Sequence, residues 1–350
     1  MPNAVFTQVK SITDQQVQPL PTPALEPGQA RMAIQQFALT ANNVTYAATG
    51  FDIGYWKFFP TGQDGAGLVP VWGFAEVVES QSDAAPLGQR YYGFWPMAEQ
   101  VVITPAATSG KSIVDASAHR KDLPAVYNHY IPAGAASPKD AYQALLQPLI
   151  ATSWLIADWL GDNSTFGAEQ VIIGSASSKT GLGTCAFLKG STKVIGLTSS
   201  GNVEFTKNLG YCDEVLTYDQ IEDIPQAPSV YVDMAGNAAV KRRIHAHLGD
   251  TLKHSSAVGL SHWDQFEPPK DLAGPKPQFF FAPAQIAKRR EDWGPGAVEK
   301  KIAEATQQIA MDAGRWLKIE EHNGLTAAMD AYAQLANGKS DPSVGHVVNL

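Results

Sequence analysis

The sequence predicts an α/β protein that combines a small, mostly antiparallel β domain with a doubly wound parallel sheet. Residues 169–202 contain two apolar, β-branched segments separated by a helical pattern, which is typical of a βαβ unit. Strand and helix patterns continue to alternate after this unit, as a parallel sheet requires. The first 140 residues instead contain short apolar segments between turn-rich stretches, and this spacing favours antiparallel strands.

The elements of the first domain can be placed in chain order. Apolar segments predict strands over 30–39, 71–79, 90–94 and 99–103. Residues 142–160 form a strongly apolar helical stretch, interrupted by Pro148, that ends at Gly161. We place the crossover between the domains there. The predicted β domain comprises residues 1–140 and 290–350, and the parallel-sheet domain comprises residues 141–289.

The second domain begins with a buried strand over 171–173, a helix over 180–189 and a strand over 193–198. Further strands are predicted over 214–218, 230–236, 256–260 and 279–283, with a helix over 238–248. Helices over 300–316 and 325–335 and a terminal strand over 345–350 follow. The basic clusters 241–243 and 288–290 are expected to lie on solvated helix faces.

Composition and charge limit the class of function. The formal net charge of −8 argues against general nucleic-acid binding. Neither a signal peptide nor an apolar run of membrane-spanning length is evident, so we expect a cytoplasmic protein with no membrane partner. Cys185 and Cys212 are the two cysteines, and neither has a partner at metal-ligand spacing. We therefore expect reduced thiols and no metal.

The turn after the first strand of the βαβ unit is the predicted cofactor site. Such a turn presents backbone N–H groups at a helix N-terminus, where a pyrophosphate is favoured. The G-x-G-x-x-G pattern is degraded here, because Ser175, Ser178 and Lys179 occupy places where glycines are expected. Hydroxyl and ammonium groups can themselves bind phosphate. The predicted phosphate-binding residues are Ser175, Ser177, Ser178, Lys179 and Thr180.

Two alternatives to this interpretation were considered. A P-loop would need glycine at the positions of Ile173 and Ser178, so that motif fails. A serine-rich turn that binds nothing remains the other alternative.

The end of the second strand sets the expected cofactor preference. A site for NAD usually carries an acidic residue there, which would repel a 2′-phosphate. No acidic residue occurs before Glu204 in this stretch. Hydroxyl and amide groups suit NADP(H) better, and the candidate residues are Thr198, Ser199, Ser200 and Asn202.

The whole pattern resembles the medium-chain dehydrogenase/reductase superfamily, in its zinc-free quinone and enoyl reductase branch. Residues 88–93 resemble the family segment Gly-Asp-Arg-Val-x-Gly, and residues 175–181 lie where the branch has Gly-Ala-Ser-Gly-Gly-Val-Gly. Residues 346–350 are similar to its closing strand. The resemblance implies a GroES-like catalytic domain and a Rossmann cofactor domain. The Ser-Ser-Lys-Thr loop resembles, more narrowly, the DUF2855 family, whose name implies no activity.

The resemblance also bears on metal. The zinc-containing branch uses a catalytic Cys and a Cys-rich second site, whereas no cysteine precedes Cys185 here. Both zinc sites are therefore expected to be absent, and zinc-polarised alcohol oxidation is not favoured.

Without a metal, reduction by a nicotinamide needs a proton or hydrogen-bond donor. Residues 41–50 resemble the branch segment Asn-x-x-Asp-x-x-x-x-x-Gly, which lies beside the nicotinamide, and this implies a cofactor role for Asn43. Tyr46 falls about where the family has Asp. Enoyl thioester reductases carry a catalytic Tyr soon after the Gly, at a distance similar to that of Tyr55. Tyr46 and Tyr55 are rival proton donors, although either ring could simply pack against a loop.

A second candidate group lies just before the crossover helix. There His129 follows Tyr127 and Asn128, and an imidazole flanked by phenols could relay or donate protons. A surface loop with satisfied side chains is the alternative interpretation.

The remaining cofactor positions follow predicted strands. Ala235, Gly259 and Ser261 lie at strand ends where, by superfamily analogy, the nicotinamide would lie, and residues 282–285 would form a loop covering it. His262 is a further catalytic candidate. Many aromatic residues in and beside the smaller domain suggest a pocket for an apolar or aromatic substrate.

These observations predict an NADPH-dependent, metal-free oxidoreductase that reduces an activated C=C bond in an enone, quinone or enoyl ester. The expected partner is a small apolar or aromatic carbonyl compound. A zinc-independent ketone or aldehyde reductase and a catalytically silent NADPH-binding sensor remain alternatives. The resemblance also implies a possible homodimer through the sheet edge near residues 279–281.

Overall fold

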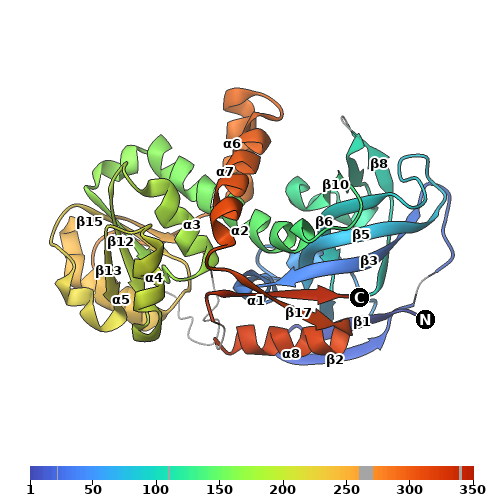
Figure 1. Cartoon of the computed structure of the whole chain (residues 1–350), viewed down its shortest axis with the longest axis horizontal. Helices are drawn as coiled ribbons and strands as arrows, with labels where there is room; N and C mark the ends of the chain where they lie inside the picture. Colours follow the sequence, from blue (N-terminus) through green and yellow to red (C-terminus); the bar gives the residue numbers. More distant parts are fainter. Residues whose placement is uncertain (22, 109–110, 260–270, 339–340) are drawn as a thin grey trace. The chain divides into compact units, whose positions relative to one another are not determined.

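The computed structural model describes residues 1–21, 23–108, 111–259, 271–338 and 341–350, which form two compact units (Figure 1). Unit 1 comprises Met1–Leu145, Leu317–Ser340 and Val344–Leu350, and unit 2 comprises Leu146–Trp316 and Asp341–Ser343. The division differs from the predicted one at residues 290–316, which belong to unit 2. The reason is that helices α6 (Ala282–Trp293) and α7 (Ala297–Ala313) pack on each other, and α6 is ion-paired to α2 (Lys139–Asp162).

Unit 1 is β-rich, as predicted. Its larger sheet has nine strands among the described residues, in the order β17-β18-β3-β5-β6-β10-β9-β8, with β7 also pairing with β3. A smaller sheet has the order β2-β1-β4. The strands are β1 (Asn3–Gln8), β2 (Ser11–Pro19), β3 (Ala30–Leu39), β4 (Ala66–Leu68), β5 (Pro70–Ser80), β6 (Arg90–Pro96), β7 (Gln100–Ile103), β8 (Pro105–Ala107), β9 (Ile113–Asp115), β10 (His129–Ala133), β17 (Lys318–Asn323) and β18 (Val344–Asn349).

The helices of unit 1 are short except for α8 (Gly324–Ala336), which connects β17 to β18. This connection makes β17 and β18 a parallel pair, and β18 then runs antiparallel to β3. The remaining helical segments are α1 (Ala41–Ala48), η1 (Tyr55–Lys57), η3 (Ala118–Arg120) and η4 (Ala125–Asn128). The terminal strand and its helix confirm the predicted return of the chain, whereas β17 was not predicted.

Unit 2 contains the predicted parallel sheet. Its strands are β11 (Gln170–Gly174), β12 (Lys193–Thr198), β13 (Glu214–Thr217), β14 (Ser229–Asp233), β15 (Leu252–Ala257) and β16 (Gln278–Phe279). Their order among the described residues is β13-β12-β11-β14-β15-β16, with every neighbouring pair parallel. The order reverses between β11 and β14, which is the topological switch point where doubly wound sheets bind ligands.

Helices connect the strands of unit 2. They include α3 (Lys179–Leu188), α4 (Val203–Leu209) and α5 (Ala238–Leu248), and α2 precedes the first strand. Pro148 lies inside α2 and does not end it, contrary to the expected interruption. None of the described helices is both long and apolar enough to cross a membrane. Phe279 lies on the edge strand β16 with 54% of its surface exposed, and association through this edge stays a prediction.

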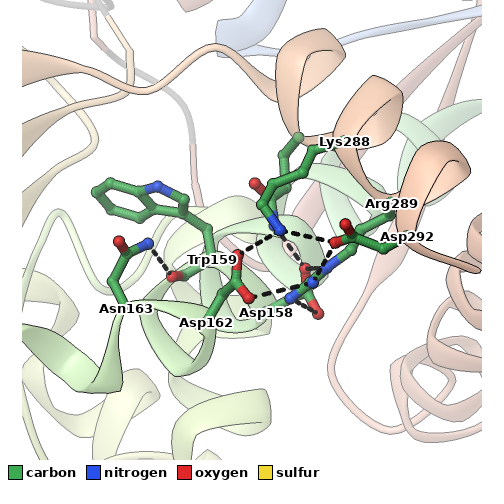
Figure 2. A network of polar contacts seen from close by, with 8 residues as sticks. Asp158, Trp159, Asp162, Asn163, Lys288, Arg289 and Asp292 are labelled. Carbon is green, nitrogen blue, oxygen red and sulfur yellow. Dashed lines mark hydrogen bonds and ion pairs between the residues drawn. The ribbon is translucent and has the colours of Figure 1, made fainter.

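The expectation that both basic clusters are solvated was wrong for two of their members. Lys241 is buried and forms an ion pair with Asp233 at 3.1 Å. Arg289 on α6 is buried and bonds both carboxylate oxygens of Asp158 on α2, at 2.7 and 3.1 Å. Figure 2 shows Lys288 and Arg289 converging on aspartates of both helices. These buried cations are structural, because each neutralises a carboxylate that has little water around it.

The network in Figure 2 predicts unequal effects for two adjacent residues. Arg289→Ala leaves Asp158 without its bidentate partner and should lower the free energy of unfolding by about 3 kcal/mol. Lys288→Ala removes an exposed cation whose ion pairs are screened by water, and it should leave the free energy of unfolding nearly unchanged. Urea unfolding measures both values, and equal losses from the two variants would contradict the assigned role of Arg289.

Candidate functional site

The turn between β11 and α3 lies directly against the sheet. Ser175 has the left-handed backbone φ of 54°, and the Ser178 hydroxyl caps α3 by accepting from the Gly181 N–H at 3.1 Å. A Cβ on Gly181 would lie 2.5 Å from the Ser175 carbonyl oxygen, and one on Gly196 would lie 2.9 Å from the Ala176 Cβ. Glycine is therefore required where the helix and β12 meet the turn, and serine suffices within it.

The hydroxyls of this turn meet the end of β12. The Ser177 Oγ accepts from the Thr198 Oγ1 at 2.9 Å and from the Asn202 Nδ2 at 3.2 Å. A hydroxyl that accepts both bonds still has its own proton to donate. Ser199 and Ser200 follow Thr198 and are exposed. The structure thus brings three of the predicted cofactor residues into direct contact, which the sequence could only suggest.

Lys179 is the first residue of α3, and its ammonium donates to the Pro342 carbonyl at 3.2 Å. Removal from water lowers the pKa of Lys179 to about 8, and the Asp341 carboxylate partly opposes this decrease. Thr180 follows it, and its carbonyl accepts a bond from the Ser153 hydroxyl at 2.8 Å. Residues 341–343 therefore lie beside the turn, which the predicted domain bounds did not anticipate.

Tyr218 is a candidate that sequence reasoning missed. Its phenol follows β13 and hydrogen-bonds with Ser175, while burial raises the pKa of the Tyr218 hydroxyl. The available signal was its place at the end of the predicted strand 214–218, on the same edge of the sheet as the turn.

The cofactor residues predicted after the later strands of the parallel sheet agree only in part with the structure. The Ala235 N–H, after β14, donates to the Asp233 carboxylate at 3.1 Å, which closes a tight turn there. Gly259 lies two residues after β15. Ser261 and His262 lie outside the described residues. The expected covering loop over 282–285 is instead the first turn of α6, where Gln285 is buried and donates to Asp158 at 2.7 Å.

Asn43 has a defined role inside unit 1. Its side-chain oxygen accepts from the Thr40 N–H at 2.7 Å, and its Nδ2 donates to the Pro70 carbonyl at 2.8 Å. Both ends of the buried amide thus hold the start of α1 against β5. Its proposed contact with a cofactor stays a prediction.

Three tyrosines of unit 1 form one buried cluster. Tyr46, Tyr55 and Tyr127 come from α1, η1 and η4, and they are 4%, 6% and 8% exposed. The Tyr55 and Tyr127 hydroxyls are hydrogen-bonded at 2.9 Å. The Tyr46 and Tyr55 rings lie 4.5 Å apart between centroids. The two predicted rival donors are therefore neighbours. Tyr127 packs against them although it is far from both in the sequence.

The phenols of this cluster differ in acidity. Burial raises the pKa of Tyr55 to about 12, and its hydrogen bond with Tyr127 partly opposes the increase. Burial raises the pKa of Tyr127 much further, as do the neighbouring Tyr55 and Tyr46. Burial also raises the pKa of Tyr46, although its oxygen accepts from Asn42 at 2.7 Å and from Trp72 at 3.0 Å. The Tyr55–Tyr127 bond thus favours the phenolate of Tyr55 and disfavours that of Tyr127.

The tyrosine cluster is held by close packing around Trp56. A Cβ on Gly50 would lie 2.2 Å from the Trp56 Nε1, and one on Gly67 would lie 2.3 Å from its Cε3. The indole therefore occupies a slot that only glycines leave open. Since Tyr55 is the preceding residue, this slot fixes the backbone that carries its phenol.

The residues of the segment 127–130 contact different parts of unit 1. Tyr130 accepts from the Arg120 guanidinium at 2.9 Å, and Arg120 is buried in an ion pair with Asp115 at 3.0 Å. His129 is the first residue of β10, opposite Val114 on β9, and is partly buried. Only Tyr127 of this segment belongs to the tyrosine cluster as defined above. The predicted proton relay through His129 stays a prediction.

Comparisons with known structures show the fold. The chain is similar to CurA from Vibrio vulnificus in complex with NADPH, with 14% identity, a TM-score of 0.65, and coverage of 99% of this chain and 98% of that one. It is similar to the yhdH oxidoreductase from Salmonella enterica in complex with NADP (15% identity, TM-score 0.55, 100% of both chains). It also resembles a putative NADPH:quinone reductase from Bacillus thuringiensis (12% identity, TM-score 0.59, 100% of this chain and 99% of that one).

These likenesses confirm the predicted architecture of a β-rich domain and a parallel-sheet domain, as in medium-chain dehydrogenase/reductases. No curated protein matches the sequence. The family described as "Protein of unknown function (DUF2855)" matches residues 37–341. The chain therefore belongs to the DUF2855 family, and its fold is similar to that of the structures named above.

Proposed function

We propose that this chain is an NADPH-dependent oxidoreductase that reduces an activated C=C bond in an enone, quinone or enoyl ester without a catalytic metal. The observation that carries the proposal is the hydrogen-bonded pair of buried phenols, Tyr55 and Tyr127. Such a pair is a proton source in apolar surroundings, which is what reduction without a Lewis acid needs. The CurA and yhdH structures named above contain NADPH or NADP, which supports the cofactor assignment.

The residues of the β11–α3 turn have the chemistry that a phosphorylated dinucleotide needs. The N-terminus of α3 offers backbone N–H groups, and Ser175, Ser177 and Ser178 add hydroxyls. Lys179 adds a cation, and no carboxylate occupies the end of β12 to repel a 2′-phosphate. These residues are the proposed cofactor site, together with Thr180, Thr198, Ser199, Ser200 and Asn202.

The residues of the β11–α3 turn would hold NADPH, which would supply hydride for the β carbon of the substrate. The C=C electron pair then moves toward the carbonyl, and a proton must reach the α carbon or the oxygen. We assign that proton to the Tyr55 hydroxyl, because its hydrogen bond with Tyr127 favours the Tyr55 phenolate and lowers the pKa of Tyr55. A bond donated by Tyr127 would stabilise the resulting Tyr55 phenolate. Both substrate atoms gain hydrogen, and the phenolate regains its proton from water.

The first experiment offers the purified protein an α,β-unsaturated ketone and its saturated counterpart, and follows NADPH oxidation. Consumption with the unsaturated compound, with saturated ketone as product, is the expected result. Alcohol formation from the saturated ketone would instead favour the carbonyl reductase. If NADPH binds but neither ketone is reduced, an enone is not the substrate. NADPH oxidation is then measured with a quinone and with an enoyl ester, and no oxidation with either would favour the catalytically silent sensor.

Tyr55→Phe keeps the ring but removes the proposed donor. We expect kcat to fall by about 100-fold or more, with the Kd for NADPH unchanged. Tyr332→Phe is the matched control, since this buried Tyr of α8 has a hydroxyl with no hydrogen-bond partner among the described residues. Unchanged turnover in Tyr55→Phe would remove Tyr55 as the donor and direct attention to Tyr46.

Lys179→Ala tests the 2′-phosphate assignment. Loss of the cation should weaken NADPH by roughly 10-fold or more and leave the Kd for NADH nearly unchanged. Fluorescence titration of both cofactors measures this difference. Equal weakening of both would mean that Lys179 acts through its bond to Pro342 and not through the phosphate.

The lowered pKa of Lys179 predicts a pH dependence. Below about pH 8 the side chain is protonated and attracts the dianionic 2′-phosphate, and above that pH it becomes neutral. The ratio of NADPH to NADH affinity should therefore decline as the pH rises through about 8. The same titration in Lys179→Ala should show no such step, and a step retained in this variant would assign it to another group.

A further inference from the structure

The edge of the large sheet in unit 1 brings together three side chains that can bind a metal ion. β17 and β18 are parallel, and Glu320 is directly opposite His346 in their register. Because side chains alternate along a strand, Glu320 and His322 share one face of β17, and His346 lies on the same face of the pair. Figure 1 shows β17 beside the C-terminal strand, and the three side chains on these two strands form one cluster.

The distances suit coordination to one ion. The His322 Nε2 lies 3.0 Å from the His346 Nδ1 and 3.7 Å from the Glu320 Oε1, and one ligand atom of each residue lies within 4.8 Å of the others. A tetrahedral zinc ion with bonds of about 2.0–2.1 Å holds its ligand atoms about 3.3–3.4 Å apart. The two imidazoles need to separate by only a few tenths of an ångström to reach that geometry.

We propose that Glu320, His322 and His346 bind one Zn²⁺ ion, with water at the fourth position. Two imidazoles and one carboxylate are a ligand set that zinc accepts, whereas calcium and magnesium prefer oxygen ligands. His322 Nε2 and His346 Nδ1 face each other, and one of them donates the hydrogen bond between the two rings. When both of these nitrogens bind the ion, that ring carries its proton on its other nitrogen instead. His346 is buried and Glu320 is exposed, so the ion reaches the site from the Glu320 side.

This site shares no residue with the turn or the tyrosine cluster, and it does not rest on the proposed reaction. It differs from the prediction of no metal, which rested on the two cysteines and on the zinc sites of the superfamily that the sequence resembles. β17 is an edge strand that is mostly exposed and buries little apolar surface. A shared ion joins β17 to β18 and stabilises an edge that hydrophobic packing holds weakly.

Calorimetric titration of the full chain tests the proposal. The protein is freed of its purification tag and dialysed against EDTA, and ZnCl₂ is then added in a buffer that does not chelate it. We expect one Zn²⁺ per chain with a Kd below 10 µM and an increase in Tm. His322→Ala and Glu320→Gln should each weaken binding by about 10-fold to 100-fold or more. Co²⁺ should give the visible absorption of a tetrahedral site.

Glu321→Gln is the matched control, because the same change one residue along β17 lies on the opposite face. It should bind Zn²⁺ like the wild type. No binding by the wild type at 100 µM Zn²⁺, wild-type affinity in Glu320→Gln, or equal losses in Glu320→Gln and Glu321→Gln would each overturn the proposal. The Tm of each variant without metal shows whether that variant folds. If His322→Ala does not fold, the comparison of Glu320→Gln with Glu321→Gln alone tests the proposal.

Discussion

The close approach of α3 to the parallel strands is the constraint on which unit 2 depends. The turn is tied to β12 by the Ala176 N–H, which donates to the Leu197 carbonyl at 2.8 Å. Backbone contact at this distance leaves no room for a Cβ at Gly181 or Gly196. Glycine is not required elsewhere in the turn, because Ser175 adopts the positive φ itself and Ser178 caps the helix better than glycine would. A degraded glycine pattern is thus compatible with an intact strand-to-helix turn between β11 and α3.

Unit 1 is organised by the opposite problem, which is how to bury polar aromatic groups. Phenols removed from water need partners, and Tyr55 and Tyr127 satisfy each other. The backbone next to Tyr55 is also closely packed, since the Trp56 indole fills the space that side chains at Gly50 and Gly67 would occupy. Arg120 and Asp115 neutralise each other beside Phe59, whose ring lies 4.5 Å from the guanidinium carbon. The same burial that positions Tyr55 also raises the pKa of all three phenols in the cluster.

Sequence reasoning succeeded where a local pattern reports burial and failed where polar residues are buried by distant partners. The buried strands β11, β12 and β14 have continuous apolar sequences, so their positions were predictable. β17 has the sequence KIEEHN, which carries no strand signal because most of it is exposed at a sheet edge. Arg289 and Lys241 have the composition of solvated helix faces, yet Asp158 and Asp233 lie beside them in the fold.

The sequence by itself determined the class of the fold, the βαβ unit and the position of its strand-to-helix turn, because these follow from periodicity and short-range spacing. It also predicted Tyr46 and Tyr55 as rival proton donors, and that role stays a prediction. Only the tertiary structure decided that Tyr127 is the partner of Tyr55, that Tyr218 meets Ser175, and that His346 faces Glu320 and His322. Each of these pairs joins segments far apart in the chain, and such contacts depend on packing and strand register, which no local pattern encodes.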